Sequence, residues 1–157
     1  MALPVLRKLY RKCRIEEINP EWLANFSVSE YEPMQALLAQ DDFTFLSRQP
    51  GFDLSLHRKL RRDRLHIFRQ YMGRLITDFN KLHFYTRMQI AHSAQDHSEL
   101  LQRLIWLKIR FSVTVIRTQV NYLLCCLGLR SLAVRALLAQ LAEMHAQVNT
   151  VAAIGAA

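Results

Sequence analysis

Nine consecutive residues, 56–64, carry a dense cluster of cationic side chains in the order LHRKLRRDR. Arg58, Lys59, Arg61 and Arg62 form its most concentrated part. Clustered arginine and lysine side chains bind phosphate groups, because they donate charge-assisted hydrogen bonds to phosphate oxygens. The tract is therefore a candidate surface for nucleic acid, for anionic lipid or for an acidic protein.

A second row of cations is more widely spaced. Arg103, Arg110 and Arg117 recur every seven residues, which keeps them on one side of a helix. The row is either the solvent-facing line of a mostly buried helix or part of a groove. In the second case the groove would pair with acids from a partner or from the N-terminal segment.

The histidine and cysteine residues do not follow metal-binding patterns. The chain has six histidines and three cysteines, but no Glu-x-x-His pair, no His-x-x-x-His pair and no zinc-like cysteine spacing. His92, Asp96 and His97 could approach one another at a helix junction, although an ordinary polar turn is the favoured interpretation. We therefore expect no metal and no cofactor.

Catalytic motifs are also missing from the sequence. It contains no G-x-S-x-G motif, and its four glycines lie too far apart to form a phosphate-binding loop. Cys13 lies among basic residues, which would favour its thiolate, but an inert cysteine is the favoured interpretation. We expect a protein that is not an enzyme and has no catalytic residues.

Composition predicts an all-α fold. The chain has 157 residues, 51% of them hydrophobic and 22% charged, and its four prolines all lie at or before Pro50. The remainder is therefore free to form long uninterrupted helices. The longest apolar stretch, residues 100–129, contains Lys108 and the row of three arginines, which would be costly at a bilayer centre. The odd cysteine count and the lack of a secretory apolar run favour a cytoplasmic protein, with peripheral membrane association as an alternative.

We expect one helical domain over residues 1–157, in which capping signals mark where each helix begins and ends. We expect three long helices, at about 53–92, 97–127 and 131–153, that form an antiparallel bundle. Several short helices, over residues 15–52, should pack across it, with starts at Pro20 and Pro33. Residues 1–14 form a basic amphipathic segment, whereas residues 15–53 hold eight acids against one base. Opposite charge predicts that this acidic segment docks on the basic first long helix.

Apolar periodicity gives the expected core. In the first long helix one wide stripe contains Leu60, Ile67, Phe68, Tyr71, Met72, Leu75, Phe79 and Leu82. The second is apolar almost all round and should be packed on several sides, which would bury Leu104, Phe111, Val115, Ile116 and Leu123, with Trp106 and Tyr122 nearly buried. The third has a heptad-like seam of Val134, Leu137, Leu141, Met144, Val148 and Val151.

These features favour a non-catalytic helical interaction or adaptor protein. Its candidate interaction surface comprises Arg58, Lys59, Arg61, Arg62, Arg103, Arg110 and Arg117. The expected occupant is a protein partner or a second copy, which could associate through the seam at 134–151. The alternative function is a basic surface that binds nucleic acid or an anionic membrane.

Overall fold

The computed structural model of the chain describes residues 20–37, 54–92, 98–126 and 135–155, and every regular element in these ranges is helical. The three long helices are α5 (Leu54–His92), α6 (Ser98–Cys126) and α7 (Arg135–Gly155). They confirm the all-α fold and match the predicted helices to within a few residues. None of the described helices combines the length and the apolarity needed to cross a bilayer.

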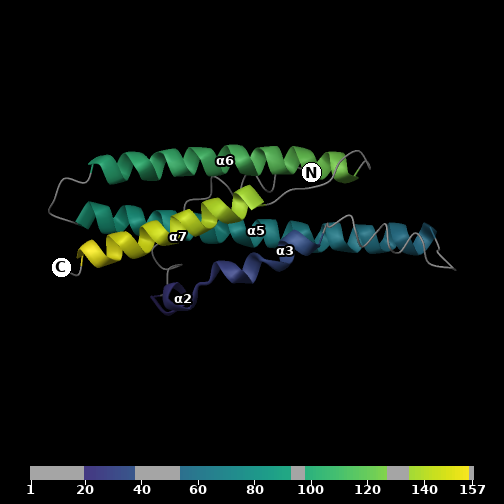
Figure 1. Ribbon diagram of the computed structural model, residues 1–157, viewed down its shortest axis with the longest axis horizontal. Helices are drawn as coiled ribbons and strands as arrows, with labels where there is room; N and C mark the ends of the chain where they lie inside the picture. The colour runs from purple at the N-terminus through teal and green to yellow at the C-terminus, as the bar shows by residue number, and fades with distance from the viewer. Residues whose placement is uncertain (1–19, 38–53, 93–97, 127–134, 156–157) are drawn as a thin grey trace.

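The long helices run in alternating directions along a common axis (Figure 1). The chain runs one way through α5, returns through α6 and reverses again in α7, which crosses both at a shallow angle. Both α6 and α7 pack against α5 and against each other, which confirms the antiparallel bundle. At its N-terminal end α5 continues past the end of α6, so the basic tract lies on the part of α5 that projects beyond its neighbour (Figure 1).

Three short elements lie on the other side of the bundle from α6: α2 (Pro20–Asn25), the 3-10 helix η2 (Val28–Tyr31) and α3 (Pro33–Ala36) (Figure 1). Proline suits the first turn of α2 and of α3, because the amide hydrogen it lacks would have no partner there. Ser27 caps η2, since its hydroxyl oxygen accepts a hydrogen bond from the Ser29 amide at 3.3 Å. The predicted starts at Pro20 and Pro33 are confirmed.

The core lies where the three long helices and the short elements meet. Its buried apolar side chains are Phe68, Met72, Leu75, Ile76, Phe79 and Leu82 of α5, Leu104, Leu107, Phe111 and Val115 of α6, Leu137, Leu138, Leu141, Met144 and Val148 of α7, and Phe26, Tyr31 and Met34. Phe79 and Phe111 stack with ring centroids 3.6 Å apart and planes 3° from parallel, so they join α5 to α6 at the centre. Ile67 was predicted in the α5 stripe but is exposed.

The prediction that α6 is packed on several sides is wrong. Leu104, Phe111 and Val115 are buried as expected, but Trp106 is 63% exposed, Ile116 43% and Leu123 44%. Tyr122 is half-buried. The physical reason is the number of neighbours: among the described elements, α5 and α7 cover one side of α6 and leave the other to solvent.

The predicted seam of α7 faces the core. Leu137, Leu141, Met144 and Val148 are buried and Val151 is half-buried, while Val134 lies outside the described residues. These side chains pack against α5 and α6, as one side of a bundle requires. The hypothesis that the seam is a self-association surface is therefore wrong, because it is already occupied within one chain.

Candidate interaction surfaces

The basic tract lies on the N-terminal end of α5, which projects beyond α6 (Figure 1). Arg58, Lys59 and Arg62 are exposed, whereas Arg61 is half-buried and has an interaction partner. Arg69 is exposed too, and its spacing of seven from Arg62 places it on the same side of the helix. The structure thus presents a basic stripe, which we define as Arg58, Arg62 and Arg69.

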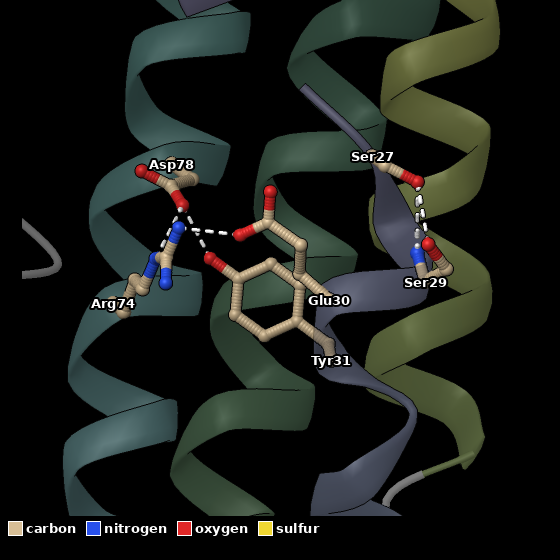
Figure 2. A network of polar contacts seen from close by, with 6 residues as sticks. All are labelled: Ser27, Ser29, Glu30, Tyr31, Arg74 and Asp78. Atoms are coloured by element: carbon tan, nitrogen blue, oxygen red, sulfur yellow. Dashed lines mark hydrogen bonds and ion pairs between the residues drawn. The ribbon is translucent and has the colours of Figure 1, made fainter. Parts of the chain in front are cut away.

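The acidic segment meets α5 further along the helix, at Arg74 and Asp78 (Figure 2). Glu30 of η2 and Arg74 form an ion pair, and the Tyr31 hydroxyl donates a hydrogen bond to Asp78. Arg74 Nε lies 3.7 Å from Asp78 Oδ2, one helical turn away. Glu30 of the acidic segment therefore docks on the basic helix at Arg74, which lies outside the basic stripe. Residues 38–53, with the remaining aspartates of the segment, lie outside the described residues.

Burial sets the protonation behaviour of this contact. The pKa of Asp78 is raised from its ordinary value of 3.8, because desolvation outweighs the opposing effects of the Tyr31 hydrogen bond and of Lys81 and Arg74. The pKa of Tyr31 is raised by burial and by the hydrogen bond to Asp78. Tyr31 therefore stays protonated and donates to the carboxyl group at physiological pH.

The arginine row borders a groove between α6 and α7. The groove has a volume of about 1000 Å³, with Arg103 and Arg110 on one side, buried Leu107 beneath, and Glu143 of α7 across from them. Arg110 and Glu143 form an ion pair that bridges the two helices. Arg103 and Arg117 are exposed. Arg103 and Arg110 thus border a groove, but the acid paired with Arg110 is Glu143 of α7 and not an acid of the N-terminal segment or of a partner. Arg117 continues the row beyond the groove.

A third surface feature is apolar and was not predicted. We define the α6 outer face as Leu101, Ile105, Trp106, Ile109, Val113, Ile116, Val120 and Leu123, whose side chains are 37–63% exposed. Six of these, from Trp106 to Leu123, are spaced alternately by three and four residues. That spacing produces a straight seam in a coiled coil. The spacing by itself predicts an apolar side of the helix, but not whether another helix covers that side.

A polar cluster also lies between α5 and α6. Lys108 donates a hydrogen bond to the buried Asn80 and lies 5.5 Å from the centre of the Phe79 ring. His83 stacks on the same ring, and its buried Nε2 atom has no hydrogen-bond partner in the described structure. Burial first, and then Lys108 and Arg87, lower the pKa of His83 to about 4. His83 is therefore neutral at physiological pH.

Metal-ligating side chains do not gather in the ranges that the structure describes: no three histidine, cysteine, aspartate or glutamate residues lie close enough to hold an ion. His92 is exposed at the end of α5, where its Nδ1 lies 2.8 Å from the Met88 carbonyl oxygen. Asp96 and His97 lie outside the described residues.

Comparison of the chain with protein-family models, with curated proteins and with solved structures finds no match. The function of the protein therefore has to be inferred from its own surfaces. Two are candidates: the α6 outer face with its arginine border, and the basic stripe of α5.

Proposed function

We propose that the protein is a non-catalytic interaction or adaptor module of the cytoplasm that binds another polypeptide through the α6 outer face. The observation that carries the proposal is the exposure of eight apolar side chains along one side of α6. Contiguous apolar surface of this kind is uncommon on soluble monomers unless it serves an interaction. A bulky aromatic residue, Trp106, belongs to the face, and tryptophan is enriched among residues that contribute most to binding.

The face is separate from the core that holds the bundle together. Phe111 and Val115 are fully buried, whereas Val113 and Ile116, two positions away or less, are exposed. Replacing the exposed residues should therefore leave the fold intact. This separation allows binding and stability to be tested independently.

The test is site-specific photo-crosslinking in cells that express the full chain. A photoreactive residue at Ile109, Val113 or Ile116 should capture the same polypeptide, whereas one at Ala139, exposed on α7, should not. The purified polypeptide should then bind the wild-type protein and lose binding to the Ile109→Lys/Ile116→Lys variant, with unchanged helicity and melting temperature. Capture at all four positions alike, or at none, would contradict the proposal.

The basic stripe supports the alternative function, a binder of polyanions. Arg58, Arg62 and Arg69 share one exposed side of α5. If they bind phosphate groups, affinity for nucleic acid or for anionic vesicles should fall steeply with salt and should drop in an Arg58→Glu/Arg62→Glu variant. Sub-micromolar affinity at physiological salt that depends on these arginines would favour the alternative over the interaction module.

A further inference from the structure

We infer that the occupant of the α6 outer face is an amphipathic helix of a different protein, with acidic residues along the border that meets Arg103, Arg110 and Arg117. The inference rests on the proposed function, because it specifies the partner of the same face. It depends on three features of the face: its periodicity, the charge on its borders and its concave side.

The periodicity matches that of a helix. With Trp106 at position a of a heptad, Ile109, Val113, Ile116, Val120 and Leu123 occupy the following d and a positions in turn. All six are 43–63% exposed, so the seam continues over about five helical turns, or about 26 Å. A partner helix with the same repeat would stay in register along this length.

The charge on the borders excludes a second copy as a matched partner. Position e is always arginine, at residues 103, 110 and 117, while position g holds Ile105, Ser112 and Gln119. Two copies in antiparallel orientation would place arginine opposite arginine, and parallel copies would place it opposite neutral side chains. A helix with glutamate or aspartate at the facing positions is the complement that the arginine row lacks. All three arginines of the row are exposed, but Arg110 is already paired with Glu143, which leaves Arg103 and Arg117 for the acids of a partner.

The concave side favours a helix over a membrane surface. The groove between α6 and α7, bordered by Trp106, Ile109 and Arg103, extends the face inwards to buried Leu107. Side chains that protrude from a helix can fill such a groove, whereas a flat bilayer surface cannot. Five of the eight residues of the face are valine or isoleucine, whose restricted χ1 angles suit interlocking of side chains between helices.

The experiment uses two synthetic helical peptides about three heptads long, with leucine and isoleucine at positions a and d. One carries glutamate at the flanking positions and its twin carries lysine. Binding to the full chain is measured by the anisotropy of labelled peptide. It is also measured by the emission of Trp106 in a Trp22→Phe variant, which leaves Trp106 as the only tryptophan. A blue shift reports that the peptide covers Trp106.

We expect the acidic peptide to bind at least about tenfold more tightly than its lysine twin, and more weakly as salt increases. An Arg103→Glu/Arg117→Glu variant should reverse this preference, and the matched Arg58→Glu/Arg62→Glu variant should keep it. Equal affinities, or an unchanged preference in the first variant, would overturn the inference. Dimers detected by light scattering and abolished by Val113→Lys would also overturn it, because a second copy would then occupy the face.

The remaining outcomes separate the inference from the proposed function. A Trp106 blue shift with anionic vesicles and with neither peptide would overturn both, because the face would then bind lipid. Binding of both peptides with equal affinity would overturn only the acidic partner and leave the interaction module standing. Failure of both peptides, together with no crosslinks at Val113, would remove both.

Discussion

The Tyr31 hydroxyl group donates a hydrogen bond to the carboxyl group of Asp78, 47 residues away in the sequence and largely buried. This contact ties the short N-terminal elements to the middle of α5 (Figure 2). The same carboxyl group lies near Arg74, which is paired with Glu30. One buried acid thus organises the attachment of the short elements, and its environment leads to two predictions.

Removing the Tyr31 hydroxyl should destabilise the fold. In a Tyr31→Phe variant the ring still packs in the core, but Asp78 loses a buried donor, which costs about 1 to 3 kcal/mol. Urea unfolding at neutral pH measures the change. Tyr85→Phe is the control, because Tyr85 is half-buried and its hydroxyl accepts a hydrogen bond from Gln89 of the same helix. Equal losses in the two variants would show that the Tyr31–Asp78 bond has no special weight.

The raised pKa of Asp78 should make its contribution to stability depend on pH. The folded protein holds this proton more readily than the unfolded chain, so the contribution is full below the ordinary value of 3.8 and is lost as pH rises through the raised pKa. An Asp78→Asn variant lacks this loss. Its unfolding free energy, measured by urea unfolding, should therefore increase relative to wild type as pH rises above the ordinary value of 3.8 and through the raised pKa. Asp63→Asn, at an exposed position of α5, is the matched control.

The lowered pKa of His83 should make stability depend on pH in the opposite direction. Its pKa is about 4 in the folded protein and 6.5 ordinarily, so the unfolded chain takes up a proton first as pH falls. Its contribution is therefore present above about pH 6.5 and is lost as pH falls towards 4. A His83→Phe variant keeps a flat ring beside Phe79 and should lose less stability on acidification than wild type. The measurement is the unfolding free energy as a function of pH, with His66→Gln as the control. If the free energy of the His83→Phe variant fell in parallel with that of wild type and of the control, the proposed role of His83 would be contradicted.

The two sides of α6 should respond differently to truncation. Phe111→Ala removes a fully buried ring stacked on Phe79 and should destabilise by about 3 to 5 kcal/mol. Trp106→Ala removes a larger side chain that is 63% exposed, and its cost should be below about 1 kcal/mol. Denaturant unfolding of the two variants measures both. A comparable loss for Trp106 would mean that the α6 outer face is part of the folded core.

Local signals in the sequence were enough to locate the helices. Prolines confined to the first third, apolar stripes of helical period and the starts at Pro20 and Pro33 follow from the steric and hydrogen-bonding properties of each residue. The seam of Leu137, Leu141, Met144 and Val148 likewise identified the core side of α7. These properties act within a few turns of one helix, so they can be read without knowing its neighbours.

The packing partners of each helix depended on the tertiary structure. Val115 and Ile116 are adjacent and both apolar, yet one is fully buried and the other 43% exposed. The reason is that, among the described elements, α5 and α7 pack against one side of α6. The pairing of Glu30 with Arg74, rather than with the basic stripe, also depends on where η2 meets α5. Hydrophobic periodicity identifies the side of a helix that carries apolar side chains. Which of these side chains are buried depends on the number and position of the neighbouring helices. For that reason, the exposure of the α6 outer face follows from the tertiary structure and not from the sequence pattern.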